Sequence, residues 1–326
     1  MGTMIDGKWR TDTWIRDNEG RFEREPTTFR DSVSSESGAE FPVVSGRYHL
    51  YVSYACPWAH RTLIVRALLG LEDAIDISVV HPYMLEEGWT FDTDFDGTTG
   101  DKVSGKDFLR QLYALADEDY SGRVTVPVLW DTETETIVNN ESKEIIRMLG
   151  TSFRSLATRP VDLCPVDYRE RIDEIIDAIY QPINNGVYRS GFATTQEAYE
   201  EAVTDLFEAL QKWDDHLGKK RYLCGDVLTE ADVCMFTTLL RFDPVYYGHF
   251  KCNLRHVYEF ENLWDYALEI YQIPEVTPTC RLDHIKSHYY YSHESINPTR
   301  VVPRGPILDH LADHDRERLP GEFATI

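Results

Sequence analysis

The sequence contains no long uncharged apolar run. Among its 326 residues, no stretch of about 18 apolar residues occurs, so we expect no transmembrane helix. The opening MGTMIDGKWR has neither the basic start nor the apolar core of a secretory leader, so we expect none. These absences lead us to expect a cytoplasmic protein.

Paired cysteines are also missing. The six cysteines lie far apart, and no Cys-x-x-Cys motif occurs. A disulfide scaffold and a four-thiolate zinc site are therefore not expected. We interpret five of the six as small apolar filler, and we predict neither a bound metal nor a bound organic cofactor. Cys56 differs from the others in its neighbours.

Positive charge is scarce. The chain has 33 Lys and Arg against 56 Asp and Glu, a net charge of −23, and only 9 of the 33 are Lys. This charge repels phosphate backbones and anionic lipid headgroups, which argues against nucleic-acid and membrane partners. Because the acids are scattered, we interpret them as a halophile-like surface adapted to high salt, where screening removes self-repulsion. An ordinary acidic cytosolic protein is the alternative.

The first half of the chain alternates between strand and helix patterns. A length of 326 residues suggests two domains. The predicted elements are strand 47–54, helix 58–71, strand 75–80, helix 106–119, strand 123–131, strand 136–138 and helix 141–150. This order is typical of a thioredoxin-like fold, in which a cis-proline at Pro127 faces the catalytic turn and exposes the backbone of Val126.

The sequence after residue 165 has helical periodicity. A capping box at Thr194–Glu197 and the same Ser/Thr–x–x–acid spacing at Thr229–Asp232 each predict the start of a helix. We therefore predict an α/β thioredoxin-like N-terminal domain and an all-α C-terminal domain. Their predicted limits are an extended segment over 1–46, the thioredoxin-like domain over 47–155, a linker over 160–165 and the helical domain with a C-terminal extension over 165–326.

The turn Cys56-Pro57-Trp58-Ala59 is the most informative site. A cysteine between a strand and a helix lies at the helix N-terminus, where unpaired N–H groups and the helix dipole favour a thiolate. Such settings lower the pKa of cysteine from about 8.5 to roughly 3.5–7.5. Ala59 stands where a dithiol oxidoreductase has its second cysteine. Cys56 is therefore expected to form a mixed disulfide that a second thiol molecule resolves; a buried structural cysteine is the alternative.

The pair Glu141-Ser142 opens the last predicted helix of the first domain. At a helix N-terminus, Ser142 and the adjacent N–H groups can hold a ligand carboxylate, while Glu141 can pair with an ammonium group. A γ-glutamyl group has both charges on one carbon atom. The pair therefore predicts a γ-glutamyl site, and a plain helix cap is the alternative.

Seven motifs stand out along the chain. They are CPWAHR (Cys56–Arg61), EEGWTFD (Glu86–Asp92), RVTVPVLWD (Arg123–Asp131), NNES (Asn139–Ser142), NNGVYRSGFAT (Asn184–Thr194), RFDPVY (Arg241–Tyr246) and DHIKSHYYYSHESINPT (Asp283–Thr299). Together they resemble the motifs of the glutathione S-transferases, and specifically of the glutathionyl-hydroquinone reductases, or Xi class. The resemblance runs from about Arg47 to Thr299.

The resemblance implies roles for individual residues. Cys56 matches the nucleophile, Tyr188 the proton donor, and Tyr246 and Tyr289 the tyrosines that hydrogen-bond near the sulfur. A neutral phenol can stabilise a thiolate or donate a proton, which suits these roles. The residues expected to bind the thiol are Trp89, which covers it, with Arg123, Val124, Thr125, Val126, Glu141 and Ser142.

The C-terminal motif also contains two histidines. His284 and His288 are four residues apart and could bind a metal on a helix, but no third ligand has suitable spacing. We therefore expect packing or supporting contacts for both.

The function implied by the resemblance is the reduction of S-glutathionyl-hydroquinones to hydroquinones through a mixed disulfide at Cys56. A conventional glutathione-conjugating transferase and a non-catalytic transferase-like interaction module stay alternatives. The co-substrate is glutathione or another thiol such as γ-glutamylcysteine, because the Glu141-Ser142 pair recognises only the γ-glutamyl end. Family analogy also suggests a homodimer. The other expected partners are small molecules, the thiol and the aromatic hydroquinone conjugate.

Overall fold

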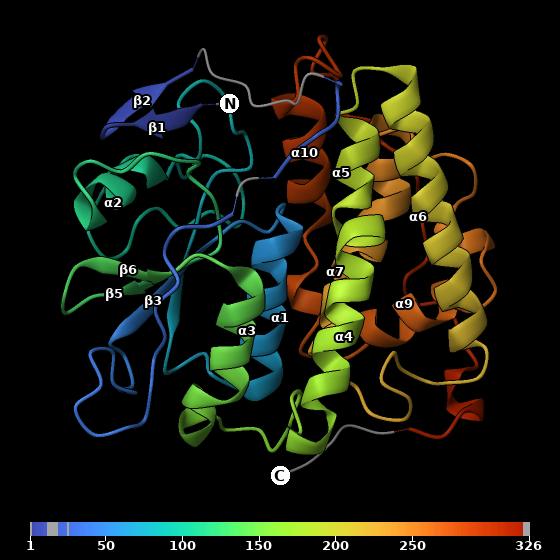
Figure 1. Cartoon of the computed structure of the whole chain (residues 1–326), viewed down its shortest axis with the longest axis horizontal. Helices are drawn as coiled ribbons and strands as arrows, with labels where there is room; N and C mark the ends of the chain where they lie inside the picture. The colour runs from blue at the N-terminus through green and yellow to red at the C-terminus, as the bar shows by residue number, and fades with distance from the viewer. Residues whose placement is uncertain (1, 12–18, 25, 322–326) are drawn as a thin grey trace. The chain divides into compact units, whose positions relative to one another are not determined.

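The computed structural model describes residues 2–11, 19–24 and 26–321 (Figure 1). By its internal contacts, the chain divides into two compact units. Unit 1 comprises Met1–Trp14, Glu25–Arg159 and Asp283–Ser292, and unit 2 comprises Ile15–Arg24, Pro160–Leu282 and His293–Ile326. Each unit therefore includes one segment whose neighbours in the sequence belong to the other unit, Asp283–Ser292 in unit 1 and Ile15–Arg24 in unit 2. The domain limits 1–46, 47–155 and 165–326 stay predictions, and residues 1, 12–18, 25 and 322–326 of those ranges lie outside the described part.

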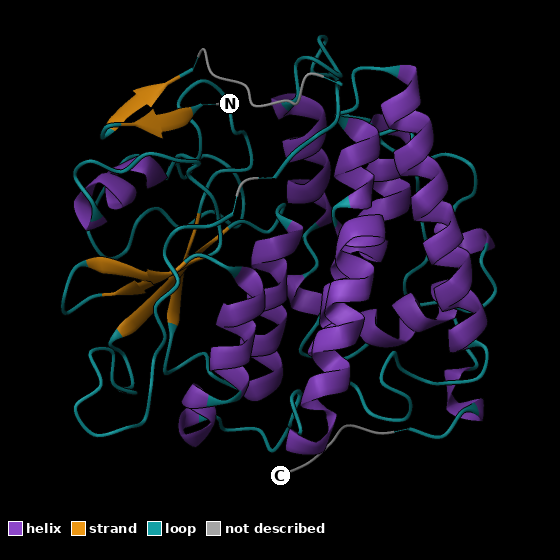
Figure 2. Cartoon of the chain, viewed as in Figure 1, coloured by secondary structure: helices purple, strands orange, loops and turns teal. Residues whose placement is uncertain are grey.

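Unit 1 is built on a four-stranded sheet, drawn in orange in Figure 2. Its strand order is β4-β3-β5-β6, with β3 parallel to β4 and antiparallel to β5. Leu50 on the central strand pairs with Ile77 on one side and Leu129 on the other. The strands are β3 (Tyr48–Val52), β4 (Asp76–Val79), β5 (Val128–Asp131) and β6 (Thr136–Asn139). The predicted thioredoxin-like order of elements is confirmed.

The strand predicted over 123–131 is shorter than expected. It begins at Val128, because Pro127 has no backbone N–H for a ladder hydrogen bond. The Val126–Pro127 peptide bond is cis, as predicted. Residues 123–126 therefore precede the strand as a separate segment that lies outside the β3–β5 ladder.

Helix α1 (Pro57–Leu69) has well-defined ends and packs against α3 (Ser142–Gly150). Pro57 occupies its first turn, where the missing N–H would have no partner within the helix. Gly70 closes it at φ 65°, a left-handed conformation that glycine adopts at little cost. The other helices of unit 1 are α2 (Leu109–Ala116), the 3-10 turn Ser152–Leu156 and all but the first residue of α10 (Leu282–Ser292).

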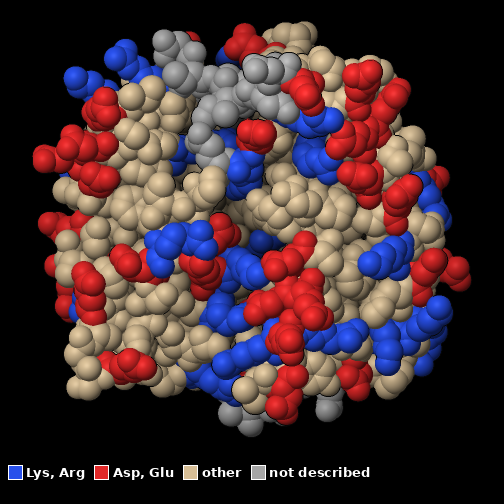
Figure 3. Space-filling view, in the orientation of Figure 1, with Lys and Arg blue, Asp and Glu red and all other residues tan. Residues whose placement is uncertain are grey.

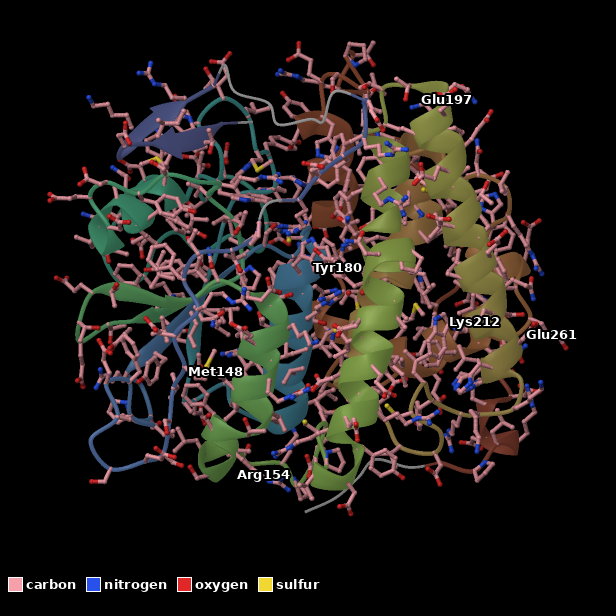
Figure 4. All side chains as sticks on the ribbon, viewed as in Figure 1. Met148, Arg154, Tyr180, Glu197, Lys212 and Glu261 are labelled. Carbon is pink, nitrogen blue, oxygen red and sulfur yellow. The ribbon has the colours of Figure 1, made fainter. Side chains whose placement is uncertain are left out.

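The N-terminal segment contains a hairpin that the sequence analysis missed. Strands β1 (Thr3–Ile5) and β2 (Lys8–Arg10) pair across Asp6-Gly7, both of which have positive φ angles. An Asp-Gly pair is a strong signal for such a turn. Farther along, Arg30 forms a bridge with Asn139, and the Val33 N–H contacts the sulfur of Met148 on α3 (Figure 4). Residues around Arg30 and Val33 thus pack on the sheet and on α3, whereas residues 19–24 belong to unit 2.

Unit 2 is helical, as predicted. Its α-helices are α4 (Arg169–Ile179), α5 (Gly186–Gly191), α6 (Gln196–Leu217), α7 (Glu230–Arg241), α8 (Tyr247–His249) and α9 (Leu263–Tyr271). Short 3-10 turns cover Val166–Tyr168, Val257–Glu259, Thr277–Thr279 and Arg316–Arg318. The capping box predicted at Thr229–Asp232 is confirmed. The one predicted at Thr194–Glu197 is wrong by one residue, because α6 has Thr195 as its N-cap and the Thr195 hydroxyl accepts from the Ala198 N–H, so Glu197 does not complete a box.

Two π-helical turns interrupt unit 2, at Tyr180–Asn184 and Phe242–Tyr246. Each contains a proline, Pro182 or Pro244. Proline lacks the N–H that an α-helix needs and crowds the preceding turn, which explains why the helix widens at these positions. The second turn ends at Tyr246, and the first lies just before the helix that contains Tyr188.

Within the described residues, none of the helices combines the length and the apolar character needed to span a bilayer.

Candidate active site

Cys56 is the N-cap of α1, where the chain leaves β3 (φ −77°, ψ 122°). Its side chain is half-buried, and its thiol lies 3.5 Å from the carbonyl oxygen of Val126. Ala59, three residues later, is fully buried on the same helix. The predicted position at a helix N-terminus, beside the segment that precedes the cis-proline, is therefore confirmed for this sulfur.

All six cysteines lie among the described residues, and none forms a disulfide. The five others are buried, whereas Cys56 is not. Burial raises the pKa of the Cys224 thiol to about 11 and that of Cys280 to about 12, which disfavours their thiolates. Position and exposure thus distinguish Cys56 from its five counterparts.

The segment Arg123–Val126 is fixed by two tyrosines that were not singled out in the sequence. The Tyr120 hydroxyl donates to the Arg123 carbonyl at 2.8 Å, and the Tyr113 hydroxyl donates to the Thr125 carbonyl at 2.8 Å. The side chains of Val124 and Val126 are buried. This segment therefore has a defined backbone next to Cys56.

Glu141 and Ser142 lie at the start of α3, as predicted. Glu141 is the N-cap, and its carboxylate accepts from the Lys143 N–H and from the Thr27 hydroxyl, each at 3.3 Å. The helix-cap alternative is therefore realised, and a γ-glutamyl role for the same carboxylate stays a prediction. The buried Ser142 hydroxyl accepts from Arg61 at 3.3 Å.

Arg61 links the two helices that begin at these sites. It is 2% exposed on α1, and its guanidinium lies 4.4 Å from the ring centroid of Trp58. A guanidinium above an indole is held by attraction to the ring's negative face. The contact with Ser142 therefore joins the Cys56 helix to α3. Arg61 belongs to the CPWAHR motif, but its sequence position alone gave it no role.

Trp89 is buried and stacks on His288 of α10, with ring centroids 4.8 Å apart and planes inclined by 21°. Its carbonyl accepts from the Leu109 N–H at 3.0 Å. Tyr289, the next residue on α10, is 1% exposed and belongs to the same compact unit as Cys56. The C-terminal motif thus supplies side chains to the thioredoxin-like unit, which local sequence patterns did not indicate.

The two histidines of α10 bind backbone carbonyls of a distant loop. His284 Nε2 lies 2.6 Å from the Asp96 oxygen, and His288 Nδ1 lies 2.8 Å from the Pro82 oxygen. Since a carbonyl only accepts, each of these nitrogens carries a proton. Both histidines therefore have the packing role that was expected. In the described part of the chain, no group of three or more His, Cys, Asp or Glu side chains is arranged to hold a metal ion.

Tyr188 and Tyr246 belong to unit 2, where they share an aromatic cluster. Their ring centroids are 6.0 Å apart, and Tyr246 stacks on Phe250 at 5.5 Å with planes inclined by 10°. Tyr188 is half-buried, whereas Tyr246 is fully buried. The cluster also includes Phe22, Phe192 and His293. The structure therefore brings together two of the three predicted tyrosines and places Tyr289 in the other unit.

Comparison with known proteins gives consistent matches over nearly the whole chain. Residues 55–152 match the family model for the glutathione S-transferase N-terminal domain, and residues 196–267 match that for the C-terminal domain. The glutathionyl-hydroquinone reductase YqjG of Escherichia coli (strain K12) is 50% identical over 97% of this chain and 99% of its own length.

Two solved structures are also closely similar. An Xi-class GST from Natrialba magadii superimposes with a TM-score of 0.94 and is 56% identical, covering 99% of this chain and 98% of that one. The glutathione-bound structure of YqjG from Escherichia coli K-12 gives a TM-score of 0.89 at 48% identity, covering 97% and 99% of the two chains.

Proposed function

The chain belongs to the Xi class of the glutathione S-transferase family, the class of the glutathionyl-hydroquinone reductases, and we propose that it reduces S-glutathionyl-hydroquinones to hydroquinones with glutathione. The membership confirms the resemblance that the sequence motifs predict. A relative that is 50% identical over nearly its whole length has this activity in its name.

The observation that carries the proposal is the position of one sulfur atom. Cys56 Sγ lies at the N-terminus of α1, half-buried and 3.5 Å from the Val126 carbonyl, with Ala59 at the position of a resolving cysteine. The helix N-terminus stabilises a thiolate at Cys56. Because no second cysteine follows, the disulfide that Cys56 forms must be resolved by another molecule.

In the first step, the Cys56 thiolate attacks the sulfur of the conjugate. A sulfur–sulfur bond forms and the bond from sulfur to the aromatic carbon breaks, with its electron pair going to the carbon. Tyr188 donates the proton that this carbon needs, and the free hydroquinone leaves. The hydroquinone has gained two electrons, and the glutathionyl group remains on Cys56 as a mixed disulfide.

In the second step, a glutathione thiolate attacks the glutathionyl sulfur of the mixed disulfide. Cys56 leaves as a thiolate, and glutathione disulfide is released. The reaction thus consumes one conjugate and one glutathione and yields one hydroquinone and one glutathione disulfide. A helix N-terminus favours this step because it stabilises the departing thiolate.

The other predicted residues serve binding. Trp89 covers the glutathionyl group, the backbone of Arg123–Val126 pairs with its peptide portion, and Glu141 with Ser142 holds its γ-glutamyl end. Tyr246 and Tyr289 hydrogen-bond near the sulfur. In this proposal the thiol-binding domain is 47–155 and the acceptor-substrate domain is 165–326.

The decisive test is Cys56→Ala, assayed for turnover of a glutathionyl-hydroquinone by the full chain. We expect turnover to be abolished while circular dichroism and thermal unfolding stay close to wild type. Cys234→Ala, which changes a fully buried cysteine on α7, is the matched control and should retain activity. Turnover by Cys56→Ala would refute the mechanism.

The alternatives give different results in simple assays. A conjugating transferase would couple glutathione to a chlorinated aromatic electrophile at high rate, whereas a Cys-type reductase would not. A non-catalytic module would leave Cys56 unreactive toward iodoacetamide at neutral pH, whereas a thiolate reacts readily. Assaying one conjugate type with glutathione and with γ-glutamylcysteine decides which thiol is preferred.

The setting of the enzyme is part of the proposal. We infer a homodimer by analogy with the family, which light scattering during gel filtration tests directly. We also infer a cytoplasmic location, because a catalytic thiol and its glutathione co-substrate must be kept reduced. Labelled chain found in an oxidising compartment would contradict that location.

A further inference from the structure

The hydroxyl of Tyr113 is bonded at every position it has. It donates to the Thr125 carbonyl at 2.8 Å and accepts from the Thr125 N–H at 3.2 Å and from Asn140 Nδ2 at 3.1 Å. A phenol has one donor and two acceptor positions, so all three are used. Tyr113 lies on α2 and is fully buried, and it contacts two segments that flank the proposed thiol site.

Asn140 is fixed from its other side by the N-terminal segment. Its Oδ1 accepts from the Phe29 N–H at 3.3 Å, and its own N–H donates to the Phe29 carbonyl at 3.1 Å. These contacts orient the amide so that its NH₂ group points to Tyr113. The next N–H, that of Glu141, donates to Asn139 Oδ1 at 2.7 Å. The loop before Ser142 is therefore held by side chains on both flanks.

We propose that Tyr113 and Asn140 form a positioning pair that sets the distance between the segment 123–126 and the start of α3, and thereby the affinity for the glutathionyl group. The inference rests on the proposed function, in which one ligand must reach both segments. Neither residue touches the reacting atoms. Their hydrogen bonds hold two separate backbones in one geometry before the ligand arrives, which lowers the entropy lost on binding.

The bond between the two residues is strong because of where it lies. Tyr113 is completely buried, and burial raises the pKa of its phenol, so the hydroxyl keeps its proton at neutral pH. Removing the hydroxyl would leave the Thr125 N–H and the Asn140 NH₂ group without this acceptor. Because a buried donor without an acceptor is costly, these two groups would shift to reach other acceptors. The segment 123–126 and the start of α3 would then no longer be held in one geometry.

The test is Tyr113→Phe, which removes only the hydroxyl and keeps the ring that packs on Phe29 at 5.8 Å. We expect Kd for S-methylglutathione, a probe that cannot form a disulfide, to rise by about 10-fold. The KM values for glutathione and for the conjugate should rise by a similar factor, while kcat stays within about 2-fold, as expected when uniform binding is lost.

The matched control is Tyr51→Phe in the same unit. Tyr51 is also fully buried, and its hydroxyl donates to Asp101 at 2.9 Å rather than to either segment of the thiol site. It should lose thermal stability as Tyr113→Phe does, with Kd unchanged. An equal rise of Kd in both variants would show a general effect of lost stability and would overturn the proposal.

Asn140→Ala provides a second approach from the other partner. We expect a similar rise of Kd. The double variant should bind about as weakly as either single variant, since each substitution breaks the same Tyr113–Asn140 hydrogen bond. Fully additive effects would overturn the pairing. Binding of S-methylglutathione is measured without turnover, so the two proposals can fail separately. A wild-type chain that binds the probe but does not reduce the conjugate would refute the proposed function, while the effect of Tyr113 and Asn140 on binding could still be measured.

Discussion

His288 stacks on Trp89 with ring centroids 4.8 Å apart, and its Nδ1 lies 2.8 Å from the carbonyl oxygen of Pro82. The two rings are separated by nearly 200 residues of sequence, yet both belong to the thioredoxin-like unit. Trp89, which we propose to cover the bound thiol, is therefore supported by a side chain from the C-terminal motif, that of His288.

We predict that His288→Ala weakens both the fold and thiol binding. Loss of a buried ring contact and a buried hydrogen bond should lower the free energy of unfolding by about 1–3 kcal/mol. The KM for glutathione should rise, because the Trp89 indole loses its support. Urea unfolding and steady-state kinetics measure the two effects. His288→Phe keeps the stacking ring and should retain most of the affinity; equal KM values for the Ala variant and wild type would contradict this role.

Tyr188→Phe should affect the first chemical step alone. If Tyr188 donates the proton to the aromatic carbon, kcat for the conjugate should fall by about 100-fold or more. Reduction of a preformed mixed disulfide on Cys56 by glutathione needs no such proton and should proceed at the wild-type rate. Tyr199→Phe, a half-buried tyrosine of the same unit whose hydroxyl bonds to the Lys251 carbonyl, is the control. Parallel loss of both steps would exclude the proton-donor role.

The capping box of α7 should make stability depend on pH. Burial raises the pKa of Asp232 to about 6, although hydrogen bonds from the Leu223 and Thr229 N–H groups lower it. The unfolded chain releases this proton at its ordinary pKa of 3.8, so between pH 4 and 6 the folded state holds more protons than the unfolded state. The contribution of Asp232 to stability is therefore full below pH 3.8 and is lost as the pH rises through 6, by up to about 3 kcal/mol.

The difference between wild type and Asp232→Asn isolates this contribution, because all other groups titrate in both proteins. We expect the free energy of unfolding of wild type, relative to the Asn variant, to fall as the pH rises from 4 to 7. Urea unfolding at several pH values measures it. Two parallel pH profiles would show that Asp232 does not titrate in this range.

Salt should stabilise this chain more than an ordinary acidic protein. The net charge is −23, and Figure 3 shows acidic side chains spread over the visible face rather than gathered in one place. Added salt shortens the Debye length from about 10 Å at 0.1 M to about 3 Å at 1 M. This screening removes most of the repulsion between the acidic side chains. We therefore expect the melting temperature to rise with NaCl and to level off near 1 M. A flat or falling curve would contradict adaptation to salt.

The sequence by itself determined what depends on near neighbours in the chain. Alternation, helical periodicity and capping residues predicted the order of strands and helices, and the strand-turn-helix around Cys56 predicted the position of its sulfur. The Val-Pro step before β5 predicted the cis peptide bond that the structure contains. Local patterns work here because backbone hydrogen bonds and caps join residues only a few positions apart.

Only the tertiary structure decided which distant residues meet. Nothing in the local sequence singled out Tyr113 among 19 tyrosines, or indicated that His288 would lie against Trp89. These contacts depend on how the sheet, the helices and the C-terminal segment pack, which many residues determine together. The position of the proposed nucleophile was therefore predictable from the sequence, whereas the side chains that support its surroundings became visible only once the chain was folded.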